Sequence, residues 1–277
     1  MLYLHIPTRR LVLGVALLGT LGACKQDTAT TPQPDVQVNA TALGSVLTDQ
    51  AGKTLYVFAN DANGQSACTG PCLTVWPVFY KENPSLGTGL NATDFTTLTR
   101  ADGSKQTAYR GWPLYYYQTD AKAGDVLGEN VNQRWFVARP DYSILIGAGQ
   151  LVGNDGKSYT KELKEGTGNT IYLTDGTGRT LYAFANDRRG KNNYTREDLS
   201  NNAIWPLFEG SVKSVPSTLR AADFATITVA GRTQVTFRGW PLYYFGSDAG
   251  QRGSTKGVSV PRPGVWPIVN ADTPQAP

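Results

Sequence analysis

Two cysteines and a set of repeated carboxylates are the candidate reactive residues of this chain. Cys68 and Cys72 stand four residues apart in the segment CTGPC. Outside the cytoplasm this spacing favours a local disulfide, which stabilises a fold by about 2 kcal/mol when the loop is so short. Two sharper hypotheses are a redox-active pair and a pair of thiolates that binds a soft metal such as Cu(I).

Histidine chemistry is missing from the mature chain that we expect. The only histidine is His5 and the only methionine is Met1, and both precede the predicted processing site described below. This excludes histidine triads, Cys–His dyads, and His or Met ligands to zinc, copper or haem. Carboxylates remain, so a hydrolase that uses two of them is a further hypothesis. We predict a protein without enzymatic activity, cofactor or bound metal, and we assign no catalytic residue.

Four of the carboxylates belong to a recurring motif, Tyr-x-aromatic-x-x-Asp, and each copy is followed by a tryptophan. In a strand, the tyrosine and the second aromatic residue share one face. The aspartate then falls just past the strand, where it can accept backbone N–H bonds and fix the exit turn, contributing about 1–2 kcal/mol. One active site does not need four copies of its carboxylate. We therefore interpret the motif residues as structural: Tyr56, Phe58, Asp61, Tyr115, Tyr117, Asp120, Tyr182, Phe184, Asp187, Tyr243, Phe245 and Asp248.

An aromatic segment, RGWPLYY, occurs twice, at residues 110–116 and 238–244. Its tryptophan falls at a predicted hairpin turn, where a side chain can be exposed. An exposed aromatic face can stack on the apolar side of a glycan or another envelope polymer. We therefore predict ligand contacts at Trp112, Tyr116, Trp240 and Tyr244.

The segments around these residues are themselves duplicated. The segment LTDQAGKTLYVFAND at 47–61 returns as LTDGTGRTLYAFAND at 173–187, and further matches keep the same order and offset. This pattern indicates a tandem duplication. We predict repeat domain 1 over residues 41–150, a connector over 151–165 and repeat domain 2 over 166–277.

The predicted fold is mainly β. Segments 45–48 and 106–109 read as strands that short hairpin turns join to the motif strands. Each domain then consists of two hairpin-based, three-stranded units with a short helical turn. The alternative is a single ring of four units that resembles a small propeller.

The N-terminal segment, residues 1–23, has the features of a lipoprotein signal peptide. Two arginines precede an apolar run, and residues 21–24, LGAC, resemble a bacterial lipobox. Cys24 would then be the lipidated N-terminus, whose acyl chains, palmitate among them, anchor the protein to a membrane. An ordinary secretory signal is the alternative. Residues 24–40, rich in Thr, Pro and Gln, predict a tether.

The charge balance is mild, because the signal takes two of the 26 basic residues and none of the 22 acidic ones. Such a balance in an exported protein excludes nucleic acid as a partner. Arg188, Arg189 and Lys191 form a basic loop tip. A tip of this kind is usually solvated, and the alternative is an anionic partner such as an acidic glycan or a lipid head group.

The expected partners are the membrane, through the N-terminal lipid, and a glycan or an envelope protein. The sequence gives no oligomeric state.

With four motif copies over nearly the whole mature chain, the sequence resembles the bacterial secreted and lipoprotein repeat family defined by the Tyr-x-(Phe/Trp/Tyr)-x-x-Asp motif. The family has no known biochemical role, so the resemblance implies a secreted or lipid-anchored protein and no reaction. We expect a lipoprotein at the outer membrane or cell surface rather than the inner membrane, acting as a non-enzymatic binding module. The alternative function is a redox or metal-handling accessory protein that uses Cys68 and Cys72.

Overall fold

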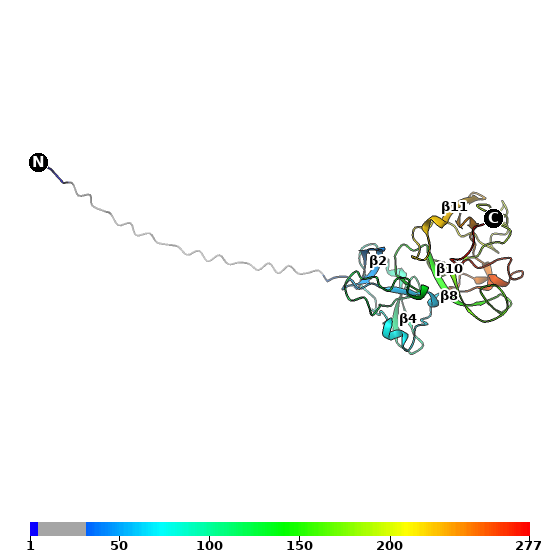
Figure 1. The fold of residues 1–277 in the computed structure, drawn as a ribbon, viewed down its shortest axis with the longest axis horizontal. Helices are drawn as coiled ribbons and strands as arrows, with labels where there is room; N and C mark the ends of the chain where they lie inside the picture. Colours follow the sequence, from blue (N-terminus) through cyan, green and yellow to red (C-terminus); the bar gives the residue numbers. More distant parts are fainter. Residues whose placement is uncertain (5–31) are drawn as a thin grey trace. The chain divides into compact units, whose positions relative to one another are not determined.

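The computed structural model describes residues 1–4 and 32–277. Cys24 and nearly all of the predicted signal peptide therefore lie outside the described residues, as does the first part of the predicted tether. Residues 33–277 form one compact unit of short antiparallel strands (Figure 1). The prediction of a mainly β fold is confirmed. We call residues 33–150 the first half and residues 151–277 the second half.

The first half opens with a hairpin of β1 (Val36–Thr41) and β2 (Gly44–Asp49). The predicted tether, 24–40, is therefore wrong from Val36 onward. Val36 is fully buried, and its N–H donates to the Ser85 carbonyl at 3.1 Å. A polar segment is recruited into the fold because β2 offers it a strand edge. A second two-stranded sheet pairs β3 (Tyr56–Phe58) with β7 (Trp135–Val137).

Each half contains one three-stranded sheet built on a tight hairpin. The sheets are β4 (Phe95–Thr99), β5 (Lys105–Tyr109) and β6 (Trp112–Pro113), and β11 (Phe224–Val229), β12 (Arg232–Phe237) and β13 (Trp240–Pro241). In both, an Arg-Gly pair makes the turn into the last strand, with φ of 48° and 77° at Arg110 and Gly111. Two consecutive residues with positive φ form a two-residue turn whose twist matches that of the flanking strands. The hairpin predicted at 106–109 is confirmed.

The third three-stranded sheet joins the halves. It has the order β10-β8-β9, where β8 is Ile144–Val152, β9 is Ser158–Tyr159 and β10 is Asn169–Asp175. In Figure 1, β8 and β10 run side by side between the two halves. Strand β8 crosses the predicted boundary at residue 150, and β9 lies within the predicted connector, which is thus part of a sheet.

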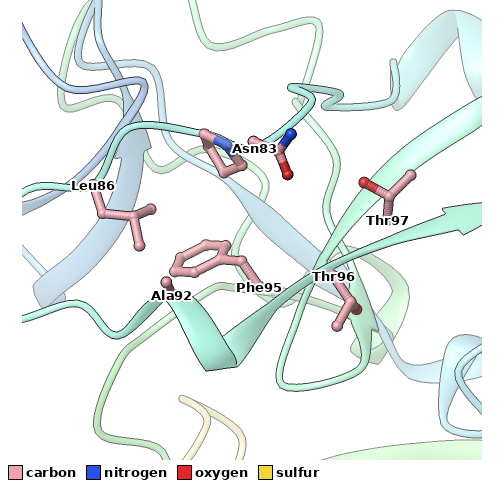
Figure 2. Close-up of a pocket in the computed structure, with 7 residues that line it drawn as sticks. Asn83, Leu86, Ala92, Phe95, Thr96 and Thr97 are labelled. Carbon is pink, nitrogen blue, oxygen red and sulfur yellow. The ribbon is translucent and has the colours of Figure 1, made fainter.

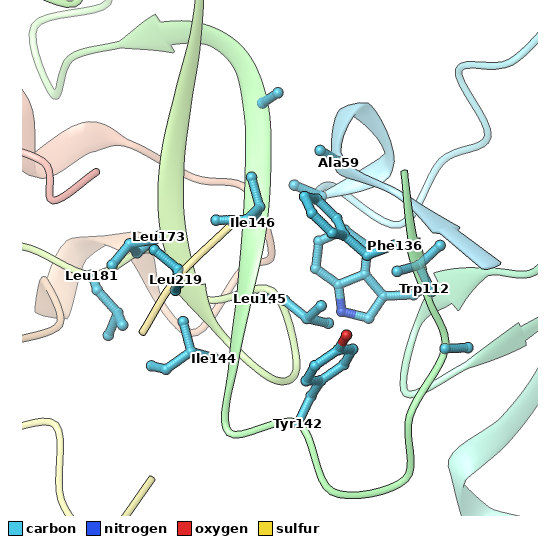
Figure 3. Packing of buried hydrophobic residues seen from close by; sticks show 14 of the residues in the cluster. Ala59, Trp112, Phe136, Tyr142, Ile144, Leu145, Ile146, Leu173, Leu181 and Leu219 are labelled. Carbon is cyan, nitrogen blue, oxygen red and sulfur yellow. The ribbon is translucent and has the colours of Figure 1, made fainter. Parts of the chain in front are cut away.

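Strand β8 is apolar on both faces because each face packs against a different half. Leu145 points towards Trp112 of the first half, whereas Ile144 and Ile146 point towards Leu173 and its neighbours in the second half (Figure 3). One continuous hydrophobic cluster therefore runs through both halves. Burying the cluster is what holds the halves together as one unit.

Helical structure is limited to short turns. The helix α1 is Cys72–Val75, and 3-10 turns lie at Ala59–Asp61, Ala92–Asp94, Val131–Gln133, Ala221–Asp223, Gly246–Asp248 and Lys256–Ser259. The helical turn predicted in each half is thus α1 in the first, whereas the corresponding stretch of the second half forms non-helical turns. Among the described residues, no helix has the length and apolar character needed to cross a membrane.

Candidate functional site

The motif residues form reciprocal pairs between the two units of each half. The motif tyrosines exchange backbone hydrogen bonds, Tyr56 with Tyr115 at 2.8 and 3.0 Å, and Tyr182 with Tyr243 at 2.9 Å in both directions. Each tyrosine hydroxyl then donates to the Oδ2 atom of the motif aspartate from the other unit. The four bonds are Tyr56–Asp120 at 2.6 Å and Tyr115–Asp61, Tyr182–Asp248 and Tyr243–Asp187 at 2.7 Å.

The other carboxylate oxygen of each aspartate fixes the loop that follows. Oδ1 of Asp61 accepts the Ala67 N–H at 2.7 Å, and Oδ1 of Asp187 accepts the Asn193 N–H at the same distance. Asp120 and Asp248 accept backbone N–H bonds seven and eight residues ahead in the same way. The motif aspartates therefore fix the turns that follow them, as the sequence predicts. Their bonds to the tyrosine hydroxyls of the other unit are not predicted by the sequence.

All four motif carboxylates are buried, with at most 6% of any residue exposed. Burial raises the pKa of Asp61 to about 7 and that of Asp187 to about 6, although the tyrosine hydroxyl and the backbone donors lower both. Burial also raises the pKa of Asp120 and Asp248. Groups so enclosed and so fully bonded hold the fold together and are closed to a substrate in this conformation.

The second aromatic residue of each motif belongs to a stack of four rings. In the first half the order is Phe58, Trp135, Trp76 and Tyr117, with centroid distances of 4.0, 3.8 and 4.3 Å. In the second half it is Phe184, Trp266, Trp205 and Phe245, at 4.5, 3.7 and 4.4 Å. The tryptophans that follow each motif are thus core residues that clamp the two units of a half face to face.

Most positions of the RGWPLYY segment have a structural task. The Arg110 backbone N–H and Nε both donate to Asp94, and Gly111 completes the turn. Leu114 is fully buried, and Tyr115 bonds the motif aspartate. Tyr116 donates its hydroxyl to Asp49, at 3.0 Å. The second copy repeats these contacts, including Tyr244 to Asp175 at 2.8 Å.

The structure does not bring the four predicted ligand-contact residues into one cleft. Trp112 is only 2% exposed, its Nε1 donates to the Gly176 carbonyl at 3.1 Å, and the Arg252 guanidinium lies 4.7 Å above its ring. The prediction of Trp112 as a ligand contact is therefore wrong, because the second half covers this hairpin turn. Tyr116 and Tyr244 are half-buried, and their hydroxyls are committed to the aspartates named above.

Trp240, the counterpart of Trp112, does border open space. It is half-buried, its Nε1 donates to the Pro274 carbonyl at 2.9 Å, and it lines a hollow of about 320 Å³ together with Pro267 and Ile268. Two other hollows carry fewer distinctive groups. One, of about 200 Å³, lies beside β4 around Phe95 and Leu86 (Figure 2). Another, of about 290 Å³, is lined by Gln150, Asn154 and Lys256.

Cys68 and Cys72 form a disulfide, with their Cα atoms 5.4 Å apart. Cys68 is buried and Cys72, the first residue of α1, is half-buried. Arg100, which is only 5% exposed, donates from Nη2 to the Cys68 carbonyl at 2.7 Å and from Nη1 to Gln106 at 2.6 Å. Within the described residues, no group of three or more His, Cys, Asp or Glu side chains is placed to hold a metal ion.

Part of the first half matches a known protein family. A family model described as a secreted repeat of unknown function matches residues 37–80 and 96–139. The first half of the chain carries two repeats of this family. The resemblance stated from the motif is thereby confirmed, and each matched span contains one of the units that exchange Tyr–Asp bonds. No curated protein and no solved structure matches the chain.

The family is described as secreted, which independently supports the export predicted from the N-terminal segment. The matched spans lie in the first half, and the second half has the same motifs, Tyr–Asp pairs and ring stacks.

Proposed function

We propose that this exported protein is a lipoprotein anchored to the bacterial cell envelope through Cys24, and that its folded part is a non-enzymatic module that binds an envelope polymer, a glycan or a protein. The anchor is proposed from the LGAC sequence at 21–24 and is consistent with the secreted repeat family. Two or more acyl chains on one cysteine would give stable membrane binding.

The observation that carries the binding role is the use of the motif carboxylates. All four are buried, and each accepts a tyrosine hydroxyl and a backbone N–H. The most strongly repeated polar groups of the chain are thus committed to the fold rather than to chemistry. Surface hollows, chiefly the one beside Trp240, remain as the places where a partner fits.

The anchor is tested by metabolic labelling with an alkyne analogue of palmitate in cells that express the full chain. We expect the wild type to take up label and to partition into the detergent phase, and a Cys24→Ser variant to do neither. Cys68→Ser is the matched control and is expected to behave as the wild type. A wild type that is released without label would show that residues 1–23 are an ordinary secretory signal.

The binding role is tested by retention of envelope fractions on the immobilised, detergent-purified protein. We expect retention of a polymer or protein fraction by the wild type, and loss of retention by Trp240→Ala. A purified protein that retains no envelope fraction would contradict the binding role. Turnover of an envelope polymer that Asp120→Asn abolishes without loss of stability would favour the hydrolase hypothesis instead.

A redox or metal-handling role for Cys68 and Cys72 is the second candidate. The observation that favours it is the buried Arg100 guanidinium beside Cys68, since a nearby cation stabilises a thiolate after reduction. Thiol trapping on intact cells tests it, and we expect a mixture of reduced and oxidised protein if the pair cycles. Complete oxidation that withstands mild reductant would end this hypothesis.

A further inference from the structure

We propose that a surface of the second half, made by the Trp240 hollow and the adjoining basic loop at 188–191, binds an anionic glycan. We call it the Trp240 surface. The inference deepens the proposed binding function and rests on it, because it names the site and the chemical class of the ligand.

The hollow combines an aromatic ring with an apolar floor and polar edges. Trp240 stands at its side, Ile268 and Val269 form buried parts of its wall, and the volume is about 320 Å³. An ion pair between Lys161 and Asp272, with Nζ and Oδ2 2.6 Å apart, borders it. This volume lies at the small end of ligand pockets, which suits a sugar ring better than a large ligand.

The basic loop is bonded to residues that neighbour the lining of this hollow. The Gly190 N–H donates to the carbonyl of Gly239, the residue before Trp240, at 2.8 Å. Arg189 donates from Nη1 to Gln275 at 2.9 Å, next to Pro274, which lines the hollow. The loop is therefore part of the same surface, although the sequence separates it from Trp240 by about fifty residues.

The loop carries three exposed cations that lack acidic partners. Arg188, Arg189 and Lys191 are exposed, and no ion pair in residues 32–277 involves any of them. The Arg188 guanidinium donates only to main-chain carbonyls, at 2.8 and 3.3 Å. In contrast, the nearby carboxylate of Asp272 is offset by Lys161. The Trp240 surface thus presents a net positive charge beside an apolar hollow.

The duplication supplies an internal comparison for this surface. The first half has Ala62 where the second has Arg188, and Trp112 where the second has Trp240. Ala62 and Trp112 are 2% exposed because the second half packs on them. The same face of the repeat is therefore an interface between the halves in the first half, while in the second half it is open and carries basic residues.

An anionic glycan matches both features at once. The C–H face of a sugar ring packs on an indole, and a carboxylate or phosphate on that ring then lies within reach of arginine and lysine donors. A membrane surface or a ring-free acidic peptide such as polyglutamate would satisfy the cations but offers no ring to the hollow. The experiment below treats both as contrary outcomes.

The test measures affinity of the detergent-purified full chain for polygalacturonate, with neutral dextran, polyglutamate and vesicles rich in anionic lipid as comparison ligands. We expect selective binding of polygalacturonate that weakens as salt is added. Replacing Arg188, Arg189 and Lys191 together by Ala should weaken it about tenfold, equivalent to about 1.4 kcal/mol. The matched control replaces three exposed lysines outside this surface, Lys53, Lys122 and Lys213, by Ala and should stay near the wild type.

The aromatic part is tested by Trp240→Ala, which should also weaken binding about tenfold, and by Trp240→Phe, which keeps a ring and should retain most of the affinity. Melting curves of both variants report whether the fold is kept. Equal binding by the loop variant and its lysine control overturns the inference, as does a preference for polyglutamate or vesicles, or no binding of polygalacturonate. If the wild type still retains another envelope fraction in those cases, the proposed binding function stands and only the Trp240 surface fails.

Discussion

Replacing Tyr115 by Phe removes one hydroxyl from the best-enclosed polar cluster of the first half. That hydroxyl donates to Asp61 at 2.7 Å and lies 2.5 Å from the Ser66 hydroxyl. Asp61 is fully buried, so water cannot take the place of the lost donor. The phenyl ring keeps the packing against Trp135, whose ring centroid is 5.1 Å away. The substitution therefore isolates the hydrogen bond.

The size of the effect should depend on pH. Burial raises the pKa of Asp61 to about 7, and the Tyr115 hydroxyl lowers it, so the variant has a still higher pKa at this carboxyl. At pH 5 the carboxyl is protonated in both proteins, and only a neutral bond worth about 1 kcal/mol is lost. At pH 8 the wild type holds a carboxylate, and losing a bond to a charged group costs about 2–3 kcal/mol. The destabilisation should therefore grow as pH rises from 5 to 8.

Urea unfolding at both pH values measures this difference, and thermal melting gives a second readout. We expect a drop in Tm of about 5–10 °C at pH 8 and about 2–4 °C at pH 5. Tyr116→Phe is the matched control, because its hydroxyl bonds the half-buried Asp49, and it should cost less than Tyr115→Phe at pH 8. A Tyr115→Phe protein as stable as this control at both pH values would contradict a charge-assisted Tyr115–Asp61 bond.

Other contacts of the fold can be tested in the same way. Burial raises the folded-state pKa of Asp61 to about 7 and that of Asp187 to about 6, so between pH 4 and 7 the folded state binds more protons than the unfolded state. The free energy of unfolding should therefore fall as the pH rises from 4 to 7. Urea titrations of Asp61→Asn should show a smaller fall. Gly128→Ala places a Cβ 2.8 Å from two aromatic rings and should cost about 1–3 kcal/mol by calorimetry, whereas Gly149→Ala, which meets nothing within 4 Å, should cost less. Cys68→Ser should lower stability by about 2 kcal/mol and leave the far-UV circular dichroism unchanged, since the second half folds without a disulfide at this place; an unfolded variant would contradict this.

The repeated parts of this protein can be predicted from the order of its residues. Alternation in a strand and the spacing of the motif are local properties, so the turn-fixing aspartates and the Arg-Gly hairpins could be predicted from chain order alone. Repetition also indicated that the motif acids are structural. The Tyr–Asp exchange and the ring stacks could not be predicted, because they join residues of different units whose docking angle no local pattern specifies.

Which copy of a repeated tryptophan borders open space depends on how the two halves pack. Trp112 and Trp240 have the same neighbours in sequence, yet the first is buried under the second half and the second lines an open hollow. A duplicated chain has only one interface between its halves. The face that carries this tryptophan is buried at that interface in the first half, and the corresponding face of the second half has no partner there. The counterpart on the other copy, Trp240, borders open space, and the exposed loop of Arg188, Arg189 and Lys191 is bonded to the neighbouring Gly239.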